Sequence, residues 1–209
     1  MYETFHCHTR FSDGELNHRQ VLEVCAQKRI SVVAFTDHDF LPDEKIWRQL
    51  KRWSDPKMNW VVGCELSSGL PRELGSGPAS SFHIVGLFVD PFDKKLNEHC
   101  RKVREGRMER MKQMVKNMQE LDLKISVTDC LKEARGETVG RPHICSALNK
   151  RKENKKVVAG LVQKMAQAAK KDAAVAQKYQ QMLRAGEKRY PYWLFLSKTA
   201  FVSGVYVDY

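Results

Sequence analysis

The chain has 209 residues, of which 42% are hydrophobic and 29% are charged, and its formal net charge is +11. This length suits one or two globular domains, and no apolar run reaches the ~18 residues that a membrane span requires. The six cysteines are scattered without a CxxC pair, so we expect free thiols in a cytoplasmic protein.

The first part of the chain alternates predicted strands and helices. In chain order these are a strand at 3–8, a helix at about 16–29, a strand at 30–36, a helix at about 42–53 and a strand at 59–65. A further strand at 82–89 would form a hairpin with 59–66 across the Gly/Pro/Ser-rich loop 67–81. In barrels built from such units, the active site lies at the carboxyl ends of the strands.

Side chains of the types that bind metal ions lie at these strand ends, except that His83 opens its strand instead of closing one. The candidates are His6, His8, Asp13, His38, Glu65 and His83. His6 and His8 share one face of their strand, because alternate residues of a strand point the same way. If the hairpin forms, His83 lies beside Glu65. Imidazole and carboxylate are the ligand mix that holds Zn²⁺, Mn²⁺ or Fe²⁺ in multinuclear hydrolytic centres, so the pattern indicates a metal-dependent hydrolase.

Four ordered motifs carry a family resemblance. They are His6-Cys7-His8-Thr9 to Ser12-Asp13-Gly14, Ala34 to Asp39, Gly63 to Ser67, and His83 to Leu87. In this order they resemble the PHP (polymerase and histidinol phosphatase) superfamily. The segment Gly140-Arg141-Pro142-His143-Ile144 is similar to one in the branch that acts on nucleoside phosphates and RNA 5′ ends.

The resemblance implies a distorted β/α barrel with two or three divalent ions, Mn, Fe or Zn. It implies that His6, His8 and Glu65 hold one ion, that Glu65 and His83 hold a second, and that Asp13 and His38 belong to a third site. Four further residues would serve catalysis. Asp37 and Asp39 would fix imidazole orientation. Arg141 and His143, which lie in a helical insertion, would bind phosphate.

The sequence also departs from the family pattern, because the later barrel ligands, a His after a glycine-rich strand and an Asp-x-His, are absent. We therefore expect an incomplete barrel, or one that is completed by something outside this sequence. The expected domains are a barrel part with the metal motifs at 1–93, a basic helical insertion at 94–189, and a return to the barrel as apolar strands at 190–209.

The positive charge is concentrated in the predicted insertion. Residues 1–100 carry 12 Lys/Arg against 14 Asp/Glu, whereas 101–118 carry 7 against 2 and 151–189 carry 11 against 3. A helix at about 94–121 carries a methionine stripe typical of a core contact. The segment 155–185 is rich in Ala, Lys and Gln and has helical propensity. The basic helices would bind a nucleotide or short RNA. His18 and His99 are expected to be surface residues.

We expect hydrolysis of nucleotide phosphate esters by a metal-bound hydroxide. The candidate substrates are 5′-phosphonucleotides, nucleoside 3′,5′-bisphosphates and RNA 5′ ends. Two other enzymatic or binding functions stay open, namely a phosphomonoesterase of the histidinol-phosphate type and a non-catalytic nucleic-acid-binding remnant. A non-functional truncation product is the remaining alternative. P-loop, Rossmann and G-x-S-x-G patterns are absent from the sequence.

Overall fold

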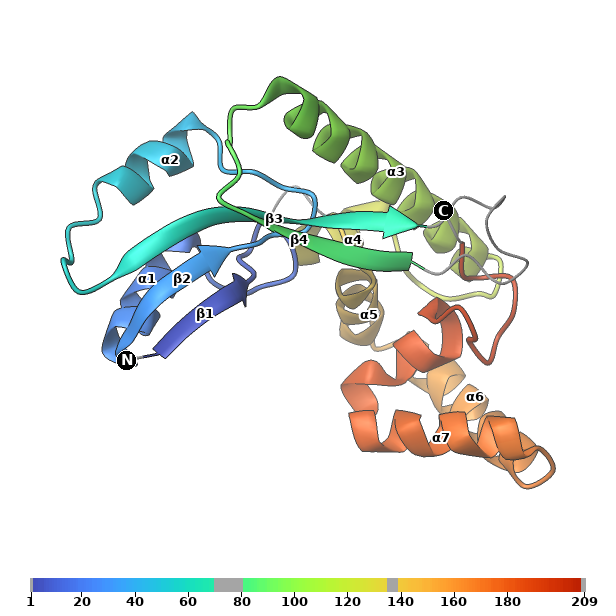
Figure 1. Cartoon of the computed structure of the whole chain (residues 1–209). Helices are drawn as coiled ribbons and strands as arrows, with labels where there is room; N and C mark the ends of the chain where they lie inside the picture. Colours follow the sequence, from blue (N-terminus) through green and yellow to red (C-terminus); the bar gives the residue numbers. More distant parts are fainter. Residues whose placement is uncertain (1, 70–80, 135–138, 208–209) are drawn as a thin grey trace. The chain divides into compact units, whose positions relative to one another are not determined.

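The computed structural model describes residues 2–69, 81–134 and 139–207 (Figure 1). It divides into two compact units. The first comprises Met1–Glu105 and Ala134–Thr138, and the second comprises Gly106–Glu133 and Val139–Tyr209. The domain boundaries expected at residues 93 and 189 stay predictions.

The first unit contains a curled four-stranded sheet in the order β1-β2-β3-β4. Its elements are β1 (Tyr2–Cys7), α1 (His18–Gln27), β2 (Ile30–Phe35), α2 (Glu44–Lys51), β3 (Asn59–Gly69) and β4 (Ser81–Leu87). The pairs β1–β2 and β2–β3 are parallel, whereas β3 and β4 form the antiparallel hairpin expected from the sequence. The α/β fold class is confirmed, with these four strands forming a half-barrel among the described residues.

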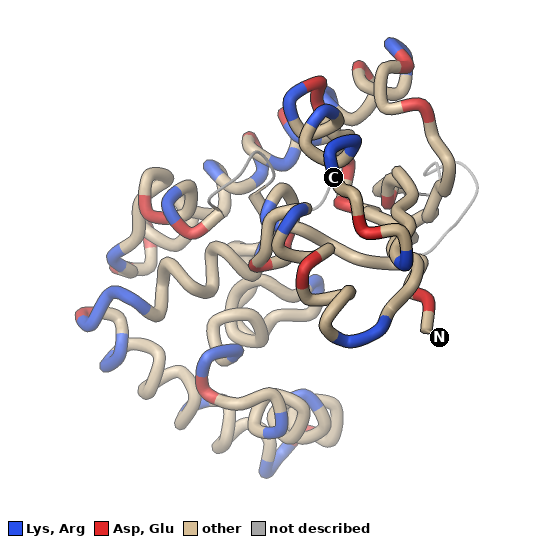
Figure 2. The backbone as a smooth tube through the Cα atoms, turned by 90° about the vertical axis from the view of Figure 1, so that its left-hand side faces the viewer, with Lys and Arg blue, Asp and Glu red and all other residues tan. Residues whose placement is uncertain are grey.

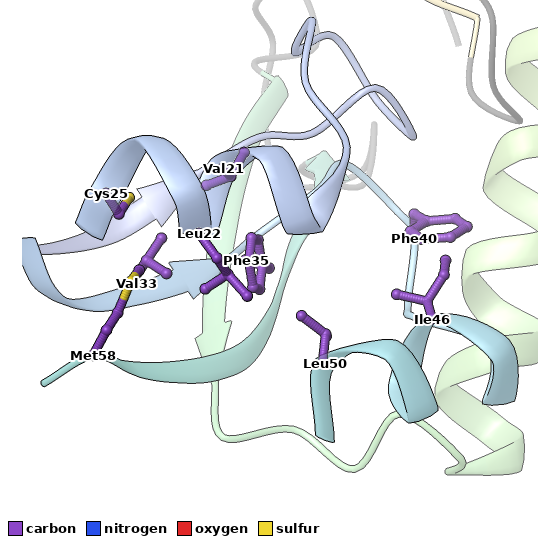
Figure 3. Close-up of a cluster of buried hydrophobic side chains, with 9 residues drawn as sticks. All are labelled: Val21, Leu22, Cys25, Val33, Phe35, Phe40, Ile46, Leu50 and Met58. Atoms are coloured by element: carbon purple, nitrogen blue, oxygen red, sulfur yellow. The ribbon is translucent and has the colours of Figure 1, made fainter. Parts of the chain in front are cut away.

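The core of this unit lies between the sheet and the first two helices (Figure 3). Leu22 of α1, Phe35 of β2 and Leu50 of α2 are each 1% exposed, and Val33 is completely buried. Both helices begin at a side-chain cap, because Asn17 accepts a hydrogen bond from the Gln20 backbone N–H and Asp43 accepts one from that of Ile46. The caps fix where each helix starts and leave the preceding loops at the carboxyl ends of β1 and β2.

The remaining helices are α3 (Lys94–Gln119), α4 (Val127–Ala134), α5 (Arg141–Lys150), α6 (Asn154–Ala169) and α7 (Ala173–Ala185). The methionine stripe of α3 is confirmed as core, since Met111, Met114 and Met118 are at most 2% exposed. None of the described helices is long and apolar enough to cross a membrane. All six cysteines are free thiols, as expected.

In the second unit, the helical character expected at 155–185 is confirmed, whereas the expectation of strands at 190–209 is wrong. Residues 155–185 form two helices, because the chain turns after Ala169 and Asp172 caps α7 by accepting from the Ala174 N–H. The predicted strands at 190–209 are absent from its described part, where the 3₁₀ turn η2 (Glu187–Arg189) precedes the π-helix η3 (Tyr192–Leu196). The three residues Leu194–Leu196 are buried, and a short buried apolar run has no periodicity that separates strand from helix.

Candidate metal centre

A buried carboxylate, that of Glu65, lies at the centre of the candidate site. Glu65 lies on β3 and is 6% exposed. Its backbone N–H donates to the carbonyl of Asp37, its carbonyl accepts from the N–H of Asp39, and His38 forms a parallel bridge with it. The segment 37–39 thus continues the pairing of β2 with β3, which places the residues after β2 directly against this carboxylate.

Four imidazoles approach the Glu65 carboxylate. His6 Nε2 and His8 Nε2 lie 2.7 and 3.0 Å from Oε2, and His83 Nδ1 lies 2.6 Å from Oε1. His38 Nδ1 lies 3.5 Å from Oε2. The register of the β3–β4 hairpin explains the position of His83. Because His83 pairs with Ser67, it lies two residues along β4 from the residue that pairs with Glu65, and its side chain is on the same face of the sheet as that of Glu65. The expected proximity of the Glu65 and His83 side chains is confirmed.

The loop after β1 brings Asp13 to the same region. Asp13 Oδ1 lies 3.4 Å from His8 Nδ1, and Asp13 Oδ2 lies 3.9 Å from His38 Nε2. The loop is tight, since the Gly14 N–H donates to the carbonyl of Thr9. A Cβ at Gly14 would lie 2.4 Å from the carbonyl oxygen of His8, so only glycine fits there without moving the backbone.

These six residues form three overlapping groups whose ligand atoms lie within 4.8 Å of one another. The groups are His6, His8 and Glu65; His8, Asp13 and His38; and His38, Glu65 and His83. Nitrogen and carboxylate donors in this arrangement fit Zn²⁺, Mn²⁺ or Fe²⁺. The sharing of Glu65 between two groups fits a carboxylate that bridges two ions.

The electrostatics of Glu65 favour its charged form. Burial by itself raises the pKa of a carboxyl group. The charge of His38 and the hydrogen bonds from His83 and His6 act in the opposite direction and hold the pKa of Glu65 below its ordinary value. The Glu65 carboxyl group is therefore anionic at neutral pH.

Asp37 organises the loop that carries His8. Its buried carboxylate accepts from the Thr9 N–H at 2.6 Å, the Thr9 hydroxyl at 2.7 Å and the Ser12 hydroxyl at 2.6 Å. Because Ser12 Oγ donates its only proton to Asp37, it accepts from His8 Nδ1, which lies 3.2 Å away. This places the His8 proton on Nδ1 and leaves the Nε2 lone pair directed at the side of Glu65, where a metal ion would bind.

Asp39 anchors the strand that carries Glu65. Its carboxylate accepts from the Ser67 N–H at 2.8 Å and the Ser67 hydroxyl at 2.7 Å. Its backbone has a positive φ of 49°, and its carbonyl accepts a hydrogen bond from Arg104. Asp39 thus fixes β3 two residues beyond Glu65.

His18 is buried and not a surface residue, so the expectation for it is wrong. It is 4% exposed, its ring packs against Phe11 and Phe35, and its Nε2 lies 3.8 Å from Asp37 Oδ2. Burial lowers the pKa of His18 to about 4. The helix start at Asn17 turns this first helical residue inward, which its polar sequence context does not indicate. His99 is exposed, as expected.

Arg141 and His143 lie in the second unit, in the first turn of α5. His143 Nδ1 accepts from the Gly140 N–H at 2.9 Å, so the imidazole proton is on Nε2. The Arg141 guanidinium donates to the carbonyl of Leu196 and lies 5.4 Å from the centre of the Tyr192 ring. Their expected role in phosphate binding stays a prediction.

Comparison with known proteins adds independent information. The chain matches the PHP domain over residues 4–208. It is 34% identical over 110 residues to the 3′,5′-nucleoside bisphosphate phosphatase of Chromobacterium violaceum, which covers 52% of this chain and 35% of that protein. It is 25% identical over 143 residues to the 5′-3′ exoribonuclease Rnm of Salmonella typhimurium, and this alignment covers 68% of this chain and 46% of that protein. The chain thus spans less than half the length of these curated relatives.

Two solved structures are similar in fold. One, from Bifidobacterium adolescentis and classed as a metal-dependent phosphoesterase, aligns with a TM-score of 0.58 and 27% identity, covering 70% of this chain and 49% of that chain. The other, an amidohydrolase from Chromobacterium violaceum with bound sulfate and no metal, aligns with a TM-score of 0.57 and 26% identity. This alignment covers 70% of this chain and 48% of that chain.

Replacement of Glu65 by Gln should remove bound metal, because it deletes the anionic donor that two of the three ligand groups share. We expect the wild type to retain at least two equivalents of Mn, Fe or Zn per chain, and Glu65→Gln to retain about one or fewer. Plasma mass spectrometry of the purified proteins measures this directly. The matched control is Glu98→Gln, on the exposed surface of α3. Equal metal content in Glu65→Gln and wild type would contradict the assignment.

The burial of His18 should make the folded protein less stable at acidic pH. The unfolded chain protonates His18 near pH 6.5, whereas the folded protein resists protonation down to about pH 4, so the free energy of unfolding falls as the pH drops through this window. The full contribution of this shift is about 3 kcal/mol. Urea unfolding with a chelator present, at several pH values, should show a smaller loss for His18→Phe. Identical pH slopes for the two proteins would disprove the burial argument.

Proposed function

We propose that this chain, which belongs to the PHP domain family, is a metal-dependent phosphoesterase that hydrolyses phosphate esters of nucleotides or RNA 5′ ends. The observation that carries the proposal is the convergence of four imidazoles and Asp13 around the buried Glu65 carboxylate. The named activities of the two curated relatives, a nucleoside bisphosphate phosphatase and an exoribonuclease, support the substrate class.

The proposed ligand assignment follows the three groups. His6, His8 and Glu65 would hold one ion, His83 with His38 and Glu65 a second, and Asp13 with His8 and His38 a third. Divalent ions bound there supply Lewis acidity, neutralise charge on phosphate oxygens and lower the pKa of bound water towards ~7.

The other polar residues of the site would act through the ligands. The hydrogen bonds from Ser12 and Thr9 to Asp37 hold the His8 loop and select the His8 tautomer that offers Nε2. Asp39 holds β3 through Ser67, so that the Glu65 carboxylate keeps its position between the imidazoles. These bonds would preorganise the site, which reduces the reorganisation that catalysis would otherwise require.

Substrate binding would use Arg141, His143 and the basic helices. Arginine offers a planar pair of N–H donors that match two phosphate oxygens, and His143 carries a proton on Nε2. The helix α3 carries nine Lys/Arg against three Asp/Glu, and α6 carries three Lys and no acid. Figure 2 shows the Lys and Arg residues of the chain in blue. This charge favours a polyanionic substrate over a small phosphomonoester.

Hydrolysis should depend on His8. With Mn²⁺ added, the wild type should release phosphate or mononucleotide from a nucleoside 3′,5′-bisphosphate or a 5′-phosphorylated RNA, and His8→Ala should lower the rate by roughly 10²-fold or more because an ion is lost. The matched control is His99→Ala, which removes an exposed imidazole of α3 and should keep full activity.

The same assay separates the alternatives. A histidinol-phosphate-type enzyme would prefer that small phosphomonoester over every nucleotide. If the protein is a nucleic-acid-binding remnant, the wild type and His8→Ala would bind RNA with equal affinity and a steep salt dependence, and neither would show metal-stimulated hydrolysis. Either result would contradict the proposed function.

A further inference from the structure

A groove separates α1 from α2 in the first unit, and it is distinct from the candidate metal centre. Its volume is about 960 Å³. The floor is apolar, because Leu22 of α1 and Ile46 and Leu50 of α2 line it and are each at most 6% exposed. The two helices have 10 and 8 residues, so the groove is roughly 12–15 Å long.

The rim of this groove is positively charged. Its cations are Arg10, Arg19, Lys45 and Arg52, and its acids are Asp43 and Asp55. Both acids are engaged locally: Asp43 caps α2 through the Ile46 N–H at 2.7 Å, and Asp55 accepts from the Lys57 N–H at 2.9 Å.

Three of the four cations, Arg10, Lys45 and Arg52, form no ion pair with any described residue. Arg19 forms an exposed ion pair with Glu23. Lys45 and Arg52 are exposed. The groove therefore combines an apolar floor with cations that remain available to an anionic ligand.

Aromatic side chains lie in the same groove. Phe11 and Trp53 both line it, and both are partly buried against the hydrophobic core. One face of the Phe11 ring stacks on Phe40, and the Arg10 guanidinium lies 5.7 Å from the centre of the Phe11 ring. A cationic groove lined by partly exposed aromatic rings is an arrangement by which proteins bind single-stranded nucleic acid, because the cations contact the phosphates and the rings contact the bases.

The groove is connected to the candidate metal centre through one loop. Arg10 and Phe11 are consecutive residues between the ligands His8 and Asp13. A strand that occupies the groove would therefore pass the loop that carries Asp13, with its phosphates along the rim between α1 and α2.

We propose that the groove between α1 and α2 binds single-stranded nucleic acid, so that the substrate is the end of a polynucleotide and not only a free mononucleotide. The inference rests on the proposed function for the identity of the chemistry. Lys45 and Arg52 contact phosphates, and Phe11 and Trp53 contact bases.

The test is a binding measurement on the full chain with EDTA present, so that no hydrolysis occurs. The probe is a short 5′-phosphorylated oligouridylate with a 3′ dye, titrated by fluorescence anisotropy at several KCl concentrations. The double variant Lys45→Glu/Arg52→Glu should bind at least about 10-fold more weakly at ~50 mM KCl. Its slope of log K against log salt should be shallower by about 1.4, because two phosphate contacts are lost.

The matched control is Lys28→Glu/Lys57→Glu, which makes the same change in net charge at two exposed lysines that do not line the groove. We expect it to keep the wild-type slope. Equal weakening in both double variants would overturn the proposal, because net charge alone would then explain the binding. Absence of oligonucleotide binding by the wild type would also overturn it.

Mononucleotide hydrolysis on the same proteins separates this proposal from the proposed function. The groove variant should hydrolyse a nucleoside 3′,5′-bisphosphate at the wild-type rate, since that substrate does not extend into the groove. A matching loss of mononucleotide hydrolysis would contradict the groove assignment. If the wild type hydrolyses no phosphate ester at all, the proposed function fails, while the anisotropy titration still tests the groove.

Discussion

The clustering of four imidazoles around one buried carboxylate is the constraint on which the rest of the first unit depends. Glu65 is held on both sides by backbone hydrogen bonds to Asp37 and Asp39, so its position is set by the sheet and not by its own rotamer alone. His6 Nε2 and His8 Nε2 lie only 2.8 Å apart and point at the same oxygen. A cation bound among these nitrogen and oxygen atoms would be coordinated by all of them, so the cluster is a candidate metal centre.

Different residues hold the two sides of this cluster in place. Asp37 acts on the β1 side through Thr9 and Ser12, and Asp39 acts on the β3 side through Ser67. Two acids that are two residues apart in the sequence thus hold two different segments, the loop after β1 and the strand β3. The same short loops also place Arg10 and Phe11 in the groove between α1 and α2, so catalysis and binding of a strand would share one structural support.

Much of this arrangement follows from the sequence. The period of two in a strand places His6 beside His8, and the hairpin register places His83 beside Glu65. The burial of His18 does not follow, because a polar residue at a helix start is usually exposed. The hydroxyl contacts of Ser12 and Ser67 do not follow either, since serine is common in loops and its partners are set by tertiary structure. The apolar run around Phe195 fits a strand or a helix equally well until its packing is known.

The central claim is that Glu65 bridges two metal ions held by these imidazoles. Anomalous X-ray scattering from crystals grown with Mn²⁺, with data collected on both sides of the metal absorption edge, tests it most directly. We expect two peaks roughly 3.5–4 Å apart, one beside His6 and His8 and one beside His83, with the Glu65 carboxylate between them. Crystals without an anomalous peak within coordination distance of Glu65 would contradict it.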